Sequence, residues 1–247
     1  MASGEVSRRP WSGVTGGACE RAMPLGSRKA RLWLGGALAC LAWGAVAQGA
    51  FAATTVALWH MDETSGTVMR DAVKSHHGSF ANHPVRLGGP GFSGFAYGFN
   101  GSTSYVSVPS AGDLNPGSAR LTITVRLKTT SLPPPEDWDL LRKGVFSTPG
   151  GEWKMEYYPS GQAACAFKGS SNYSELIAGP KLNNGQWHTV TCEKTPSAIK
   201  LIVDGRTFSR SVNIGSIANS ASIVIGAHPN GSEYFKGSLD EASISVG

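Results

Sequence analysis

The sequence predicts an all-β fold, an antiparallel β-sandwich of two sheets that follows an N-terminal leader. Glycine supplies 32 of the 247 residues, well above the usual share of about 7% and without a Gly-X-Y period, which is typical of a chain with many tight turns. About ten short runs of β-forming residues alternate with clusters of Gly, Pro, Asn and Ser. No window of eleven or more residues carries apolar side chains at the 3.6-residue period of a helix.

Residues 1–53 are predicted to be a signal-type leader rather than part of the fold. A basic stretch at 27–31 precedes an apolar run at 32–47, and small residues that suit cleavage follow. The apolar run is shorter than the roughly 20 residues of a membrane-spanning helix, and Met23 is an alternative start of translation. We therefore expect a secreted mature chain, residues 54–247, without a transmembrane span. A leader that is retained as an anchor is the alternative.

The charge of the chain gives no support to a nucleic-acid partner. The formal net charge is +5, but the residues before Thr54 supply +4 of it, from six basic and two acidic side chains. The remaining +1 is too small for the basic surface that nucleic-acid binding needs. Residues 54–247 also contain no linker and no internal repeat, so we expect one domain.

The expected strands are defined by alternation of apolar and polar residues. The clearest is 120–128, in which Leu121, Ile123, Val125 and Leu127 alternate with polar residues and therefore share one buried face. Asp204-Gly205 predicts a type I′ hairpin turn, because that turn needs positive φ at both central residues. The other expected strands are 55–60, 95–99, 105–109, 152–158, 163–168, 187–193, 199–203, 207–211, 222–226 and 239–246.

Within 152–158, one face of the expected strand is aromatic and apolar. Trp153, Met155 and Tyr157 share this face, and a core position is favoured over a sugar-binding one. The triple proline at 133–135 predicts an exposed loop, since proline cannot donate to a strand ladder.

Four short segments follow one another across the chain in a specific order and spacing. They are 58–66 (LWHMDETSG), 98–109 (GFNGSTSYVSVP), 185–190 (GQWHTV) with 201–205 (LIVDG), and 235–242 (FKGSLDEA). Together they resemble the laminin G-like, concanavalin A-like lectin/glucanase jelly-roll family. The resemblance implies two antiparallel sheets in which the first and last strands pair.

The resemblance also bears on a disulfide and on a metal. Members of this family often bridge the strands that hold Cys165 and Cys192, and two cysteines in an exported chain most simply form one disulfide. Members often bind a structural Ca²⁺, for which the matching positions are Asp62, Asp71 and Asp240. The family pattern has further aspartates that this chain lacks. The alternative is that the three aspartates cap turns and accept backbone hydrogen bonds.

The fold that the resemblance implies also hosts glycoside hydrolases, so catalysis has to be considered. The Glu-x-Asp-x-x-Glu pattern of such hydrolases is missing from the sequence. Glu152 and Glu156 are about 13 Å apart along one strand, and Asp137 and Asp139 are expected in the loop after the prolines. We expect these carboxylates to be solvated charges and the protein not to be an enzyme. A glycoside hydrolase with carboxylates distant in sequence is the alternative.

The remaining interpretation is a non-catalytic binding module for a glycan or an extracellular protein. Trp138 and Tyr234 are the predicted ligand-binding residues, because both are expected in exposed loops at the rim of a rigid sandwich. A structural or adhesive accessory protein is the other alternative, and fold-level analogy does not choose among these functions.

Overall fold

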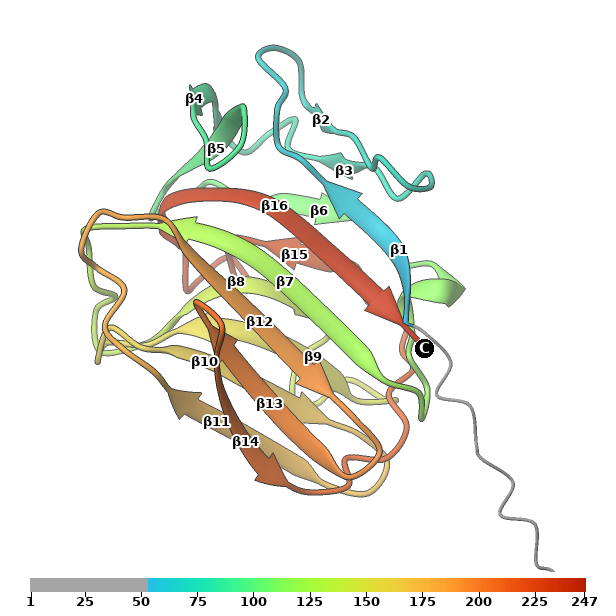
Figure 1. Ribbon diagram of the computed structural model, residues 1–247. Coiled ribbons are helices and arrows are strands. Elements are labelled where there is room, and N and C mark those ends of the chain that lie inside the picture. The colour runs from blue at the N-terminus through green and yellow to red at the C-terminus, as the bar shows by residue number, and fades with distance from the viewer. Residues whose placement is uncertain (1–52) are drawn as a thin grey trace, which may run out of the picture. The chain divides into compact units, whose positions relative to one another are not determined.

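The computed structural model describes residues 53–247. The predicted leader and the alternative start at Met23 lie outside these residues, apart from residue 53. The described chain is an all-β sandwich of two antiparallel eight-stranded sheets (Figure 1), which confirms the predicted fold class. No helix in this part of the chain has the length and apolar character needed to cross a membrane.

The first sheet contains the first and last strands of the described chain. β1 pairs with β16 outside the main path of the sheet, as the resemblance implied. In spatial order the main path is β14 (Arg206–Ser211), β13 (Ala198–Val203), β12 (His188–Lys194), β7 (Leu121–Lys128), β16 (Lys236–Val246), β5 (Phe95–Asn100) and β4 (Arg86–Pro90), and β1 is Thr54–Trp59.

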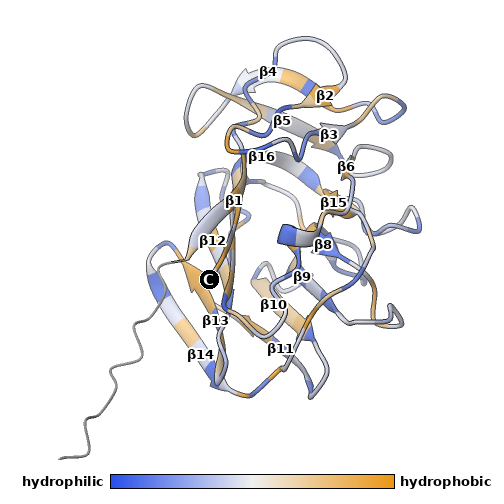
Figure 2. Cartoon of the chain, turned by 90° about the vertical axis from the view of Figure 1, so that its right-hand side faces the viewer, coloured by the Kyte–Doolittle hydropathy of each residue, from blue (hydrophilic) through white to orange (hydrophobic). Residues whose placement is uncertain are grey.

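The second sheet faces the first across the core. Seen from the side, β12 to β14 of the first sheet lie beside β8 to β11 of the second (Figure 2). A short 3-10 helix, Gly112–Leu114, follows β6. In spatial order the second sheet is β11 (Tyr173–Ala178), β10 (Ala163–Lys168), β9 (Glu152–Tyr157), β8 (Trp138–Lys143), β15 (Ile223–Ile225), β6 (Val106–Val108), β3 (Gly78–Ser79) and β2 (Val68–Met69).

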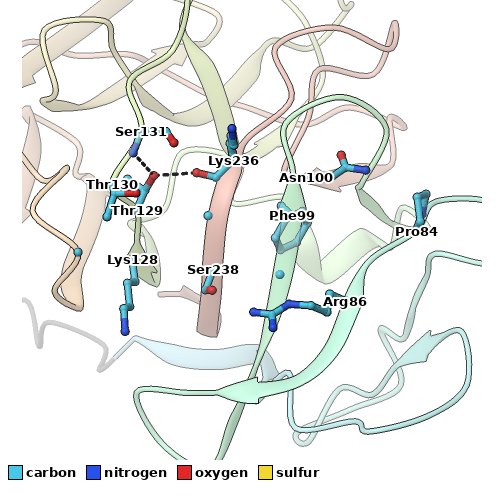
Figure 3. A pocket seen from close by; sticks show the side chains of 13 residues that line it. Pro84, Arg86, Phe99, Asn100, Lys128, Thr129, Thr130, Ser131, Lys236 and Ser238 are labelled. Carbon is cyan, nitrogen blue, oxygen red and sulfur yellow. Dashed lines mark hydrogen bonds between the residues drawn. The ribbon is translucent and has the colours of Figure 1, made fainter.

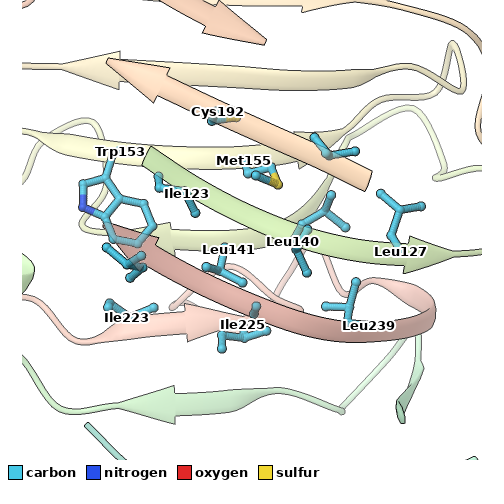
Figure 4. Packing of buried hydrophobic residues seen from close by; sticks show 14 of the residues in the cluster. Ile123, Leu127, Leu140, Leu141, Trp153, Met155, Cys192, Ile223, Ile225 and Leu239 are labelled. Carbon is cyan, nitrogen blue, oxygen red and sulfur yellow. The ribbon is translucent and has the colours of Figure 1, made fainter. Parts of the chain in front are cut away.

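The core lies between the sheets and is built by period-two alternation on their inner faces. The four apolar residues of β7, from Leu121 to Leu127, are completely buried while the polar residues between them are half-buried. On β9 the predicted core face, Trp153, Met155 and Tyr157, is likewise buried. Figure 4 shows Trp153 and Met155 of the second sheet packed with Ile123 of the first. Burying one such large apolar side chain stabilises the fold by roughly 1.5–3 kcal/mol.

A disulfide joins the two sheets through the core. Cys165 on β10 is bonded to Cys192 on β12, with their Cα atoms 5.5 Å apart, which confirms the predicted pairing. The hairpin predicted at Asp204-Gly205 connects β13 and β14. Both of its residues have positive φ, 48° and 82°, as a type I′ turn requires.

Candidate functional site

The outer face of the second sheet, opposite the core, carries a groove with a charged floor. The groove encloses about 490 Å³. Its walls come from β8, β9, β11, the end of the loop before β8, and the loops at 145–147 and 228–233. The lining residues are Asp137, Arg142, Val145, Phe146, Ser147, Glu152, Lys154, Tyr173, His228 and Glu233.

The charged floor follows from the same alternation that builds the core. Because the odd-numbered residues of β9 face inward, Glu152, Lys154 and Glu156 face outward. On β8 the register shifts between Asp139 and Leu141. This irregularity lets Asp139 and Arg142, three residues apart, both turn toward the same face as the β9 residues.

Arg142 is the centre of the floor. Its Nη1 donates to Asp139 Oδ2 at 2.7 Å and its Nη2 to Glu152 Oε2 at 2.9 Å. Its Nε donates to the carbonyl oxygen of Gly144 at 3.0 Å. Arg142 Nη1 also lies 3.7 Å from Glu233 Oε2. The guanidinium therefore fixes carboxylates from two strands and a loop. The Arg142 side chain is only 3% exposed, so it makes almost no contact with water.

Glu156 and Lys154 form a second ion pair beside this centre. The Glu156 side chain is completely buried. Burial raises the pKa of the Glu156 carboxyl to about 9, and the negative charges of Asp139 and Asp137 add to the rise while Lys154 opposes it.

Glu233 reaches the floor from the loop before β16. The loop is attached to β8 because the Asp139 N–H donates to the Glu233 carbonyl oxygen at 3.0 Å. Glu233 has a φ of 51°, which strains a residue with a side chain. Burial and the neighbouring Asp139 carboxyl raise the pKa of Glu233 to about 7. Carboxyl groups with raised pKa values in a groove are typical of functional sites.

Two exposed aromatic rings stand at one side of the groove. Phe146 is 58% exposed and Tyr173 is 42% exposed. Their centroids are 5.4 Å apart in an edge-to-face arrangement, and Lys168 Nζ lies 3.8 Å from the Phe146 ring centroid. The groove thus combines an apolar aromatic wall with a polar, hydrogen-bonding floor, the usual composition of a small-ligand site.

The prediction that Trp138 is an exposed loop residue is wrong. Trp138 begins β8 and is only 6% exposed, and it packs against Tyr157 and Phe235. The loop with the triple proline ends before it, so the tryptophan enters the core. Asp139 is also in the strand rather than in a loop, and Glu152 and Glu156 are buried rather than solvated.

Tyr234 is half-buried and adjoins the groove without lining it. Its ring lies 6.5 Å from that of Tyr105. A contact between Tyr234 and a ligand stays a prediction.

The three aspartates predicted to bind calcium act here as acceptors for backbone N–H groups. Asp71 accepts from Leu58 and Val73 through Oδ1 and from Lys74 and His76 through Oδ2.

The other two aspartates hold the turn at 92–95. Asp240 accepts from the N–H groups of Phe92, Ser93 and Glu241, and Asp62 accepts from that of Phe95. Oxygens engaged in this way do not fit the gathered set of free oxygen ligands that Ca²⁺ needs. Calcium at these three residues stays a prediction.

A second hollow, of about 470 Å³, lies on the outer face of the first sheet. Arg86, Lys128 and Lys236 give it a basic lining, and Figure 3 shows Thr129 held between the backbone of Lys236 and that of Ser131. Among the lining residues that the structure describes, Phe99 alone is aromatic, and it is buried. This hollow therefore lacks the aromatic wall of the groove on the second sheet.

Sequence reasoning missed most of the groove. The alternation on β9 contains the signal for three of its residues. It assigns Trp153, Met155 and Tyr157 to the core, so it also implies that Glu152, Lys154 and Glu156 face outward. Phe146 and Glu233 come from irregular loops, where no periodicity indicates which side chain faces a ligand.

Comparisons with known proteins place the fold in a group with varied functions. A family model described as "Concanavalin A-like lectin/glucanases superfamily" matches residues 100–246. No curated protein sequence matches the chain.

Among solved structures, domain 4 of AbnA, a GH43 extracellular arabinanase from Geobacillus stearothermophilus in complex with arabinotriose, has a TM-score of 0.57 at 19% identity. The match covers 79% of this chain and 93% of that domain.

Two further structures are similar over part of their length. Trypanosoma rangeli sialidase in complex with sialic acid has a TM-score of 0.57 at 16% identity, over 77% of this chain and 30% of the sialidase. Mouse laminin α1 chain domains LG4-5 have a TM-score of 0.52 at 16% identity, over 63% of this chain and 43% of that one. At these identities the likeness shows the fold alone.

Proposed function

Because the chain belongs to the concanavalin A-like lectin/glucanase superfamily, we propose that it is an exported module that binds a glycan in the groove of its second sheet and does not cleave it. The aromatic pair Phe146 and Tyr173 carries this proposal. Both rings are exposed at the edge of a floor made of charged hydrogen-bonding groups. A sugar ring presents an apolar C–H face that packs on aromatic rings and hydroxyls that bond to such a floor.

The structural comparison supports this class of ligand. The structure of the AbnA domain contains arabinotriose, and the match with this chain covers 93% of that domain. An isolated domain of this architecture can therefore bind an oligosaccharide, and the shared fold leaves the identity of the sugar to the groove residues.

The burial of Glu156 supports binding rather than hydrolysis. Glycoside hydrolases use a pair of carboxyl groups that flank the scissile bond. Glu156 is completely buried and paired with Lys154, so a glycosidic oxygen in the groove would not reach it.

A glycoside hydrolase is the second candidate, favoured by one observation. A partly exposed carboxyl with a pKa of about 7, as Glu233 has, suits a general acid. Turnover of a polysaccharide panel that is abolished in Glu233→Gln or Asp137→Asn would establish hydrolysis. Binding without product formation would support the proposed module.

Export is supported by the disulfide between the sheets, because disulfides persist in oxidising compartments. A glycan array that stays blank, together with specific capture of one extracellular protein, would favour a protein partner or an adhesive accessory role instead.

The experiment that tests the proposal is a glycan array followed by titration calorimetry with the best ligand. Phe146→Ala and Tyr173→Ala are expected to weaken binding about tenfold each, equivalent to about 1.4 kcal/mol. Tyr234→Ala tests the residue predicted from sequence.

Phe92→Ala is the matched control. Phe92 is 50% exposed and has Arg126 over its ring at 4.0 Å, much as Lys168 lies over Phe146, but it is not part of the groove. Equal loss in Phe92→Ala and Phe146→Ala would contradict the proposed site.

A further inference from the structure

We infer that Asp137, Glu156 and Glu233 form a binding site for one divalent cation, with Ca²⁺ as the best-fitting ion, at the floor of the groove. These are not the residues for which the sequence predicts calcium. The inference goes beyond the proposed glycan binding, and it is tested with the metal alone.

The distances suit the coordination sphere of calcium. One oxygen from each of the three carboxylates lies within 4.8 Å of the other two. Ca²⁺ binds oxygens at 2.3–2.6 Å, so ligands on opposite sides of the ion are about 4.6–5.2 Å apart. The three oxygens therefore lie close enough together to bind one calcium ion. Mg²⁺ demands near-ideal octahedral geometry and gives up its waters reluctantly, so a set of protein carboxylates favours Ca²⁺.

An independent observation points to a missing ligand at this place. Glu156 Oε1 is paired with Lys154, but Glu156 Oε2 is a buried oxygen without a hydrogen-bond partner among the described residues. The Glu156 side chain is completely buried. Leaving a buried polar group unpaired costs about 1–3 kcal/mol, and more for a charged one. A cation at the centre of the three carboxylates would give Glu156 Oε2 the partner that it lacks.

The balance of charge at the site leads to the same ion. Five carboxyl groups meet here, from Asp137, Asp139, Glu152, Glu156 and Glu233, against the two cations Arg142 and Lys154. Carboxylates that share a site repel one another unless some hold protons or a cation lies between them. A divalent cation would offset two of the excess negative charges.

The site is accessible to an ion from solvent. Asp137 and Glu233 both line the groove, and Glu156 lies beneath them. Calcium sites on proteins keep waters in part of their shell, and the open side of the groove leaves room for them.

The test is the thermal unfolding of the full chain with and without CaCl₂, after treatment with a chelator. Free Ca²⁺ at about ten times its Kd is expected to raise the Tm by about 3–6 °C. MgCl₂ should raise it less. Titration calorimetry should show one Ca²⁺ per chain.

Variants decide which carboxylates hold the ion. Asp137→Asn and Glu233→Gln should abolish the Tm rise. Asp137→Asn is the milder change for the fold, because Asp137 is half-buried at the end of a loop. Glu175→Gln on the same face of the sheet and Asp240→Asn at the other predicted calcium position should keep it.

The inference is overturned if millimolar Ca²⁺ and Mg²⁺ leave the Tm unchanged. It is also overturned if the Tm rise persists in both Asp137→Asn and Glu233→Gln, or if the rise is lost only in Asp240→Asn. None of these results depends on whether a glycan binds.

Discussion

Arg142 donates from Nη1 to Asp139 Oδ2 over 2.7 Å, and both side chains are almost completely withdrawn from water. The two residues lie on the same strand, on the face opposite the apolar core. Water does not solvate an ion pair that is buried in this way. Removal of either residue therefore leaves the charge of the other buried without a partner.

We predict that Arg142→Met lowers the free energy of unfolding by about 3–5 kcal/mol, because it leaves the carboxylates of Asp139 and Glu152 buried without their cation. Urea unfolding at pH 7 measures the change. Arg120→Met is the control, since Arg120 pairs with Glu193 at an exposed position and should contribute less than about 1 kcal/mol. Equal effects of the two substitutions would show that the Arg142 network is not buried in solution.

Removal of the disulfide is expected to destabilise the sandwich by about 3–4 kcal/mol, the loop-closure value for cysteines 27 positions apart. The double variant Cys165→Ala and Cys192→Ala should unfold at a lower urea concentration than the oxidised protein. A reducing agent should shift the wild-type curve toward that of the double variant and leave the double variant unchanged. A reductant effect on the double variant would mean that the bond is not its target.

Asp71 is expected to make stability sensitive to acid. Burial raises the pKa of its carboxyl, but four backbone N–H donors outweigh burial and leave the pKa below its ordinary value. Because the folded-state pKa of Asp71 is depressed, its carboxylate stabilises the fold in full above pH 3.8, the ordinary pKa value. This stabilisation is lost as the pH falls toward the folded-state pKa.

The measurement for this prediction is the unfolding free energy of the wild type and of Asp71→Asn between about pH 2 and about pH 6, a range that extends to both sides of the ordinary aspartate pKa. The difference between the two proteins should shrink as the pH falls. A difference that stays constant over this range would contradict the assigned role of the carboxylate.

Two glycines with nearly the same backbone conformation should respond very differently to alanine. Gly150 and Gly66 have φ values of 85° and 90°. A Cβ on Gly150 would lie 1.8 Å from the carbonyl oxygen of Ala218, whereas nothing lies within 4 Å of a Cβ on Gly66.

Gly66→Ala should therefore lower stability by about 1 kcal/mol from positive φ alone, and Gly150→Ala by at least about 2 kcal/mol more, since backbone must move. Denaturant midpoints of the two variants check this ordering. Similar midpoints would show that the contact between Gly150 and Ala218 relaxes easily.

The sequence predicted the sandwich well where burial acts on one face only. Alternation in 120–128 and 152–158 assigned the inner faces of β7 and β9, and Asp204-Gly205 placed the hairpin between β13 and β14. These features depend on residues close together in the chain, so local pattern is sufficient.

Prediction failed where both faces of a strand are covered. β8 reads WDLLRK, and all six residues are buried, because the loop with Glu233 covers the face that would otherwise be exposed. Charged residues under such a cover resemble a loop in sequence, which explains the wrong assignment of Trp138 and Asp139.

The groove could not be predicted for a related reason. Phe146, Tyr173 and Glu233 come from segments far apart in sequence, and only the register of the second sheet and the attachment of its loops bring them together. No spacing rule within a single segment indicates their proximity.

The pairing of Thr54 with Val246 on the first sheet has a practical consequence for engineering. The two ends of the folded unit are neighbours, so a short added linker would close it into a ring, and the ring could be reopened at Asp204-Gly205 to give a circular permutant. Such a permutant would keep every strand neighbour. It would carry any fused cargo on the β13–β14 edge of the first sheet and leave the groove of the second sheet unobstructed.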